Sequence, residues 1–251
     1  MKVLVIDTAL GACTVGVFDD DRPLAVRSEV MSRGHSERIG GLVRDAVAEA
    51  DVALGGFGAL DRIGVTVGPG SFTGLRVGLA FAQGLGAALA IPVVGISTLA
   101  ALARSKHAEA TGFLGIAAAI DARRGQIYLQ TFHNGLAAAP ADALSVDAAC
   151  AYLVKAKDDF AWSLVGTGAP LIMEALPRYW PTPVSQLMTP EPMPLPVAAR
   201  LIVNPTTEAL AALTLAADPD RCPPTPLYLR APDAIPPTRL PGQPRPVPVR
   251  A

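Results

Sequence analysis

The sequence predicts an α/β fold in two lobes, each built on a mixed β-sheet flanked by helices. Three strand-like segments come first, alternating helical and strand-like segments follow them, and a similar pattern starts again near residue 113. The 251 residues, 51% of them hydrophobic, are enough for one sizeable domain or for two small lobes with cores of their own.

The first three strands are expected to form an antiparallel meander. They are short runs rich in β-branched residues, and the polar turn DDDR separates the second from the third. Their ranges are KVLVIDT (2–8), ACTVGVFDD (12–20) and PLAVRSEV (23–30).

The alternating part begins with a helix over 35–54, which one apolar stripe predicts. Its apolar residues recur three and four positions apart, and Ser36 is a candidate N-cap, with His35 and Ser32 as alternatives. The following elements are a strand over DRIGVTVGPG (61–70), a helix over 73–90, a strand over PVVGIS (92–97) and a helix starting at TLAALARSKHA (98–108).

A second unit starts at FLGIAAAIDARRGQIYLQTF (113–132), as a strand, a polar turn and an alternating strand. A meander extended by alternating helices and strands is the half-domain of the actin-like ATPase (ASKHA) architecture, whose two halves face each other across a nucleotide cleft. The predicted units are therefore a first lobe over 1–108, a smaller second lobe over 109–216, and a C-terminal YLR segment with a disordered proline-rich tail over 217–251. A further proline-rich stretch, 177–196, is expected to be loop or polyproline II.

Composition excludes several classes of protein. A net charge of -1 provides no global basic field for nucleic acid or anionic lipid. Three distant cysteines favour neither a disulfide framework nor a thiolate zinc site, and they indicate a reducing compartment, the cytoplasm. No charged residue lies between Arg76 and Arg104, but Gln83 and Pro92 interrupt this run, so no membrane span is expected.

The glycine-rich stretch VGPGSFTGLRVGLAFAQGLG (67–86) lies where nucleotide-binding proteins place a phosphate loop. It matches neither GxxxxGK[ST] nor GxGxxG. The remaining candidates for an anion or nucleotide contact are Asp7, which ends the first strand, and Gly70, Ser71 and Thr73 at the helix start. The favoured alternative is that Gly70 makes the turn and a hydroxyl caps the helix; Asp7 is equally consistent with a turn former.

Small residues recur every four positions through the same stretch and therefore share one helical face. They are Gly70, Gly74, Gly78, Ala82 and Gly86. Because glycine inside a helix costs up to ~1 kcal/mol relative to alanine, close approach to another element is expected to offset this cost. That element is either the chain's own sheet or a helix of another subunit.

No catalytic set emerges from the sequence. The three histidines form no HxxxH, so neither a metal site nor a cofactor is expected. The candidate nucleophiles Ser71, Ser97 and Cys13 lie in no recognisable triad. The motif IDARRGQIY (120–128) indicates a hairpin turn with two exposed arginines, which is either a small contact patch or simply solvated.

Five motifs in order give the chain a family resemblance: VIDTA (5–9), SRGHSERI (32–39), GPGSFTGLRVGLAFAQGLG (68–86), IDARRGQIY (120–128) and PLYLR (226–230). Together they resemble the TsaB (YeaZ) family. The resemblance implies a non-catalytic scaffold in the formation of threonylcarbamoyladenosine (t6A) in tRNA. It implies pairing with a TsaD-type transferase, joined by a TsaE-type ATPase, and contact with tRNA only as part of that complex.

The resemblance further implies that the first two helices pair with the partner in a four-helix bundle; a homodimer of the chain alone is an open alternative. The expected interface residues are Ile39, Leu42, Val43, Val47, Gly74, Gly78, Ala82 and Gly86. Gly78→Leu is then expected to abolish complex formation and to leave the chain soluble. The alternative function is an enzyme acting on its own, either a nucleotide-dependent transferase or an M22-like metallopeptidase.

Overall fold

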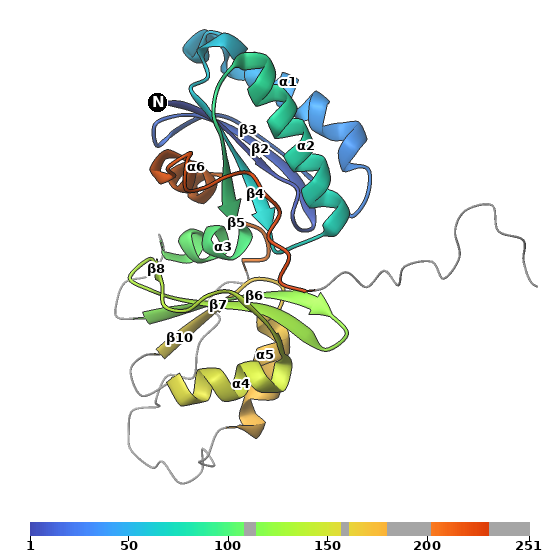
Figure 1. Ribbon diagram of the computed structural model, residues 1–251, viewed down its shortest axis with the longest axis vertical. Coiled ribbons are helices and arrows are strands. Elements are labelled where there is room, and N and C mark those ends of the chain that lie inside the picture. Colours follow the sequence, from blue (N-terminus) through green and yellow to red (C-terminus); the bar gives the residue numbers. More distant parts are fainter. Residues whose placement is uncertain (108–113, 157–160, 180–201, 231–251) are drawn as a thin grey trace, which may run out of the picture.

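The chain forms two mixed sheets with helices on their faces (Figure 1). The computed structural model describes residues 1–107, 114–156, 161–179 and 202–230. The first sheet has the strand order β3-β2-β1-β4-β5, with β1–β2 and β2–β3 antiparallel and β1–β4 and β4–β5 parallel. Its strands are β1 (Lys2–Asp7), β2 (Ala12–Asp19), β3 (Arg22–Val30), β4 (Arg62–Gly68) and β5 (Val93–Ser97).

The second sheet has the strand order β10-β6-β7-β8, and β9 also pairs with β7. The pair β6–β7 is an antiparallel hairpin, whereas β10 runs parallel to β6. Its strands are β6 (Leu114–Arg123), β7 (Gln126–His133), β8 (Leu136–Ala137), β9 (Asp142–Ser145) and β10 (Ala161–Val165).

Helices cover both faces of each sheet. In the first sheet, Leu4 and Ile6 pack under α1 and α2, while Val3 and Val5 pack under α3 and α6, because alternate side chains of a strand face opposite sides. Helix α3 also contacts one face of the second sheet, whose other face carries α4 and α5 (Figure 1). The helices are α1 (His35–Leu54), α2 (Phe72–Leu89), α3 (Thr98–His107), α4 (Val146–Lys155), α5 (Ala169–Ala175) and α6 (Thr207–Ala216), with short 3₁₀ turns at Phe57–Ala59 and Leu176–Arg178.

This arrangement confirms the predicted fold class, a meander extended by alternating elements and followed by a second mixed sheet. The predicted N-cap of α1 differs. Gly34 occupies that position with φ 87°, and none of Ser32, His35 and Ser36 caps the helix through its side chain. Glycine adopts this left-handed conformation without the steric penalty that a side chain brings.

The chain returns to the first sheet after the second is complete. Helix α6 falls within the range predicted for the second lobe, yet it packs on β1, β2, β4 and β5. The segment after it follows the first sheet, where Gly95 N donates to Cys222 O (2.9 Å) and Leu227 N donates to Val67 O (2.8 Å). The predicted lobe boundaries remain a prediction, and most of 177–196 and all of 231–251 lie outside the described residues.

Arg62 ties α6 to the start of β4. Its Nη1 donates to the carbonyl oxygens of Thr214 (3.0 Å) and Ala217 (2.6 Å), at the negative end of the helix dipole. We expect Arg62→Met to lower the free energy of unfolding by about 2 kcal/mol, because two charge-assisted hydrogen bonds are lost. Urea unfolding measures this loss. The control is Arg22→Met at an exposed position of β3, and equal losses in the two variants would contradict the capping role.

Candidate functional site

The small-residue stripe of α2 packs against the chain's own first sheet. A Cβ at Gly74 would collide with the carbonyl oxygen of Thr8, and a Cβ at Gly78 would collide with Thr8 Oγ1. The Thr8 hydroxyl donates to Gly74 O at 2.8 Å, so the helix and the end of β1 are joined at close range. Of the two alternatives left open by the sequence, the structure places the stripe against the chain's own sheet.

The other predicted interface residues are also interior. A Cβ at Gly86 would collide with the side chain of Val93, and Ala82 is fully buried. The four α1 residues of the predicted interface, Ile39, Leu42, Val43 and Val47, belong to the core between α1 and the sheet. The apolar and small faces of both helices are therefore turned toward the chain's own sheet, and a partner interface at these residues remains a prediction.

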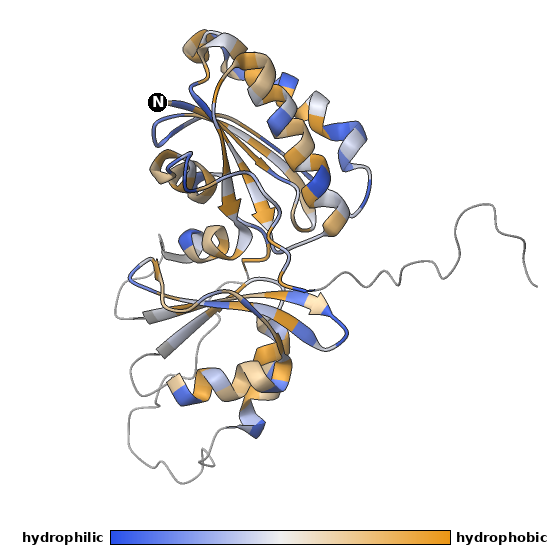
Figure 2. Cartoon of the chain, in the orientation of Figure 1, coloured by the Kyte–Doolittle hydropathy of each residue, from blue (hydrophilic) through white to orange (hydrophobic). Residues whose placement is uncertain are grey.

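The opposite side of α2 is exposed and nearly free of charge. Its residues at three- and four-residue spacing, which we call the outer stripe, are exposed except for the half-buried Val77. The outer stripe consists of Thr73, Val77, Ala80, Gly84 and Ala88. A Cβ at Gly84 would have no atom within 4 Å, and the same holds for Gly41 on α1. Figure 2 shows α2 largely in hydrophobic colours, and Arg76 is the one charged residue in its sequence.

Helix α2 is long and apolar enough to cross a membrane by length and composition alone, with a mean hydropathy of 1.2. This is weak evidence, because a helix that packs on the sheet of a globular protein can pass the same test. Here one whole side of α2 lies against Thr8 and Val93, and the C-terminal segment binds it as well, through Gln83 Nε2 donating to Pro224 O at 2.7 Å.

The start of α2 carries an aromatic and cationic cluster. The Arg76 guanidinium lies 3.8 Å from the centroid of the Phe72 ring, and its Nε donates to the Tyr228 hydroxyl at 3.3 Å. The rings of Phe72 and Tyr228 are 5.4 Å apart between centroids. Together these contacts hold the YLR segment (228–230) against the start of α2.

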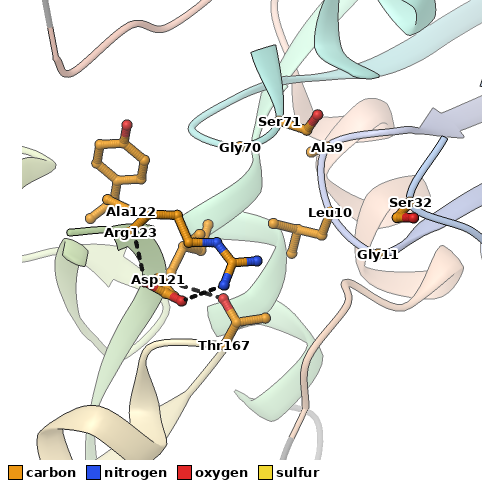
Figure 3. Close-up of a pocket in the computed structure, with 12 residues that line it drawn as sticks. Ala9, Leu10, Gly11, Ser32, Gly70, Ser71, Asp121, Ala122, Arg123 and Thr167 are labelled. Atoms are coloured by element: carbon orange, nitrogen blue, oxygen red, sulfur yellow. Dashed lines mark hydrogen bonds and ion pairs between the residues drawn. The ribbon is translucent and has the colours of Figure 1, made fainter. Parts of the chain in front are cut away.

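A cavity of about 570 Å³ lies between the two sheets (Figure 3). The first sheet contributes the turn after β1, the loop before α1 and the loop before α2, and the second contributes the β6–β7 hairpin and the loop after β10. The lining residues are Ala9, Leu10, Gly11, Ser32, Gly70, Ser71, Ile120, Asp121, Ala122, Arg123, Tyr128 and Thr167.

The charged part of this cavity is the pair formed by Asp121 and Arg123. Arg123 Nη1 lies 3.2 Å from Asp121 Oδ2, and the Arg123 amide donates to Asp121 Oδ1 at 2.8 Å. Thr167 Oγ1 in turn accepts from the Asp121 amide at 3.0 Å. The hairpin predicted at IDARRGQIY thus points one arginine back over the cavity, as Figure 3 shows.

Two of the four predicted anion contacts line the cavity. Gly70 and Ser71 do, whereas Asp7 and Thr73 do not. The Ser71 hydroxyl accepts from Gly74 N at 3.3 Å and so caps α2, as the favoured alternative expected. Sequence reasoning missed the contributions of Leu10, Ser32 and Thr167, since their meeting depends on how the two sheets face each other.

Asp7 is a buried turn former. Its Oδ1 accepts from the Ala9 amide (2.9 Å) and from Thr66 Oγ1 (2.8 Å). Burial raises the pKa of this carboxyl above its usual value, although these two hydrogen bonds and the nearby His35 act in the opposite direction. His35 is also buried, and its Nε2 has no hydrogen-bond partner.

Asp7→Asn is expected to increase the free energy of unfolding at pH 7. The folded-state pKa of Asp7 lies above the unfolded value of about 3.9, so ionisation of this group destabilises the fold as pH rises through the folded pKa. Asparagine keeps the accepting oxygen without the charge. Urea unfolding should show the gain at pH 7 and a smaller gain near pH 4, with exposed Asp21→Asn as control. A variant less stable than the native chain at pH 7 would show that the charge itself is required.

Among the described residues, no group of three histidine, cysteine or acidic side chains is placed to hold a metal ion.

The candidate nucleophiles Cys13 and Ser97 are in environments that do not activate them. Burial raises the pKa of the Cys13 thiol to about 11, and Ser97 Oγ accepts from Ala100 N at 3.3 Å. Neither group is poised for attack, because a reactive cysteine needs a lowered pKa and a serine needs an adjacent base.

Comparison with known proteins gives consistent matches. The family model "TsaD: tRNA N6-adenosine threonylcarbamoyltransferase" matches residues 26–175. The "tRNA threonylcarbamoyladenosine biosynthesis protein TsaB" of Escherichia coli is 37% identical over 139 residues, and that of Bacillus subtilis is 34% identical over 139 residues. Each match covers 54% of this chain and 58% of the relative, so it spans little more than half of either protein.

The solved structure of YeaZ from Pseudomonas aeruginosa superposes with a TM-score of 0.66 at 28% identity, covering 91% of this chain and 99% of that one. A second structure from the comparison, described as similar to the peptidase YeaZ of Pseudomonas aeruginosa, has a TM-score of 0.67 at 29% identity and covers 91% of this chain and 99% of that one. The family model matches more than half of the chain, and the relatives from Escherichia coli and Bacillus subtilis carry the same TsaB name. The chain therefore belongs to the TsaD family and, within it, to the TsaB/YeaZ proteins.

Proposed function

We propose that the chain is a non-catalytic subunit in t6A formation that pairs with a TsaD-type transferase through the exposed surface of α1 and α2. A TsaE-type ATPase joins this pair, and tRNA is contacted in the cytoplasm as part of the whole complex. The single observation that carries the proposal is the outer stripe of α2, a row of uncharged, mostly small residues that are exposed except for the half-buried Val77.

The geometry of this surface suits a helix pair on a partner. Ala80, Gly84 and Ala88 are spaced by four and have short side chains or none, so a facing helix can approach closely. Gly41 offers a similar opening on α1. The interior stripe through Gly78 supports the surface from below by fixing α2 against β1. The partner surface that we propose is therefore the reverse side of the helix from the one predicted by sequence.

A non-catalytic role is supported by the state of the candidate nucleophiles. Ser71 and Ser97 accept hydrogen bonds from backbone amides, and the Cys13 thiol is buried with a raised pKa. Among the described residues, no histidine or carboxylate forms a hydrogen bond with any of these three groups as its base. The catalytic step then falls to the transferase, and this chain contributes by binding it.

The alternative function, a transferase or M22-like peptidase acting alone, is favoured by one observation. The cavity between the sheets is large enough for a small substrate, and it lies where two-lobed nucleotide-binding proteins place their site.

Reconstitution of t6A on unmodified tRNA tests the proposal. We expect the TsaD-type and TsaE-type proteins to need this chain for modification, and the chain alone to produce none with tRNA, ATP and threonylcarbamoyl donor. Light scattering after gel filtration should show a heterodimer with the transferase, and the same measurement reports whether the isolated chain is a homodimer. Full modification without this chain, or turnover by it alone, would contradict the proposal.

A further inference from the structure

The cavity between the sheets has the form of a small-ligand site. Its volume of about 570 Å³ is within the usual range of such sites, about 300–1,000 Å³. Apolar atoms of Leu10 and Ile120 and the hydroxyl-bearing residues Ser32, Ser71 and Thr167 contribute to its wall. It therefore offers both apolar contact and hydrogen bonds to a bound molecule.

Arg123 is held toward this space by an unusual backbone. Its φ is 63°, that of Arg124 is 55° and that of Gly125 is 70°, so three consecutive residues are left-handed. Residues with side chains adopt this conformation rarely, because the Cβ approaches the following carbonyl. The Asp121 carboxylate stabilises it by accepting from both the Arg123 amide and its guanidinium. Figure 3 shows the resulting pose, with the guanidinium over Asp121 and Thr167 and directed toward Leu10.

This pose leaves donor capacity on the guanidinium. Arginine has five N–H donors in a planar fork, and its ion pair with Asp121 occupies one side. The side chain of Arg123 is 87% exposed, so the other side can reach a ligand. A planar fork is the best geometric match to a carboxylate or a phosphate. The N-terminus of α2, at Ser71 across the cavity, adds the positive end of a helix dipole.

The charge of the lining limits what the site can hold. Among the described lining residues, Arg123 and Asp121 carry the only charges, and they sum to zero. A triphosphate would place several negative charges beside the Asp121 carboxylate with a single cation to receive them. A ligand with one anionic group meets no such excess.

We infer that the cavity between the sheets binds a small molecule through one anionic group, a phosphate monoester or a carboxylate, which Arg123 receives while Asp121 orients the guanidinium. This inference is independent of pairing with a transferase, because the outer stripe of α2 contributes no residue to the cavity.

Calorimetric titration of the full chain with inorganic phosphate, AMP, ATP and acetate tests this assignment. We expect measurable binding of phosphate and AMP, or of acetate, and which of them binds identifies the anionic group. ATP is expected to bind no more than about threefold more tightly than AMP. Binding of none of the four probes would overturn the inference, as would ATP binding more than tenfold tighter than AMP.

Arg123→Gln should raise the dissociation constant of the bound probe at least about tenfold, because charge-assisted hydrogen bonds to an anion are among the stronger ones. The matched control is Arg124→Gln, which removes the same charge from the same turn at a residue outside the lining and should change the constant less than twofold. Equal effects of the two variants would show that Arg123 acts only through general electrostatic attraction, and would overturn the inference that it receives the anionic group.

A second variant tests the cavity without touching the arginine. Gly11 lines the cavity, and a Cβ there would have no atom within 4 Å. Gly11→Phe is therefore expected to fold normally, by its thermal unfolding, and to abolish binding of the probe by filling the space. Unchanged binding in a folded Gly11→Phe protein would show that the probe binds elsewhere.

Discussion

Gly84→Arg is expected to abolish pairing with a TsaD-type transferase and to leave the fold of the chain intact. Gly84 lies in the middle of the outer stripe, and a side chain there would extend into open space. In a complex, that side chain would hold two helices apart and bury an unpaired charge, which costs several kcal/mol. We expect the affinity to fall at least about 100-fold, equivalent to about 2.7 kcal/mol.

Calorimetry with the purified transferase measures this loss, and t6A formation in the reconstituted system should fall with it. Gly84→Ala is the matched control, since a methyl group adds little bulk and no charge. Circular dichroism and thermal unfolding must show that both variants remain folded. A folded Gly84→Arg protein that binds the transferase as tightly as the native chain would remove the outer stripe from the interface.

Gly78→Leu, in contrast to Gly84→Arg, is expected to destabilise the chain itself. The new Cβ would collide with Thr8 Oγ1, which donates a hydrogen bond to Gly74 O. Either α2 moves off the sheet or this buried hydrogen bond is lost. Overpacking of a close contact costs 1–3 kcal/mol, and an unsatisfied buried hydroxyl adds 1–3 more, so we expect a loss of about 3 kcal/mol or more.

Urea unfolding of Gly78→Leu and Gly84→Leu separates packing from helix propensity. Both variants replace a glycine of α2 with leucine, so their intrinsic gain in helix propensity is about the same. Only the first residue faces Thr8, whereas the second faces open space. A Gly78→Leu protein as stable as Gly84→Leu would show that the close approach to Thr8 is not maintained in solution.

The sequence alone predicts that Gly78→Leu leaves a soluble chain that cannot bind its partner. From the structure we instead expect this substitution to destabilise the chain. Spacing by four correctly predicts that Gly74, Gly78 and Ala82 share a face and that this face meets another element closely. The spacing does not identify that element, because the same period is expected for a helix that packs on the chain's own sheet and for a helix that packs on another subunit. The resolving residue is Thr8, which lies 70 positions from Gly78 and is ordinary in the sequence.

The strands of the first sheet were predictable because local pattern determines them: KVLVID alternates between two covered faces, and the turn between β2 and β3 is polar. Helix α6 was not predicted, since its apolar residues are surrounded by proline-rich sequence and its place on the first sheet depends on a long-range return. The cavity could not be predicted for the same reason, its dependence on contacts between distant parts of the chain. Arg123 was visible as part of a hairpin, but its meeting with Leu10 depends on how two separate sheets approach each other.

The return of α6 and of residues 218–230 to the first sheet has a consequence for synthesis of the chain on the ribosome. Strand β1 is made long before α6, yet one of its faces is covered by Leu210 and Ala211 of that helix. The residues through α6 must therefore leave the ribosome before the first sheet is closed on both sides. Until then Val3 and Val5 lack the part of their cover that α6 provides. The second sheet, whose strands lie between β1 and α6 in the chain, can complete its own pairing earlier.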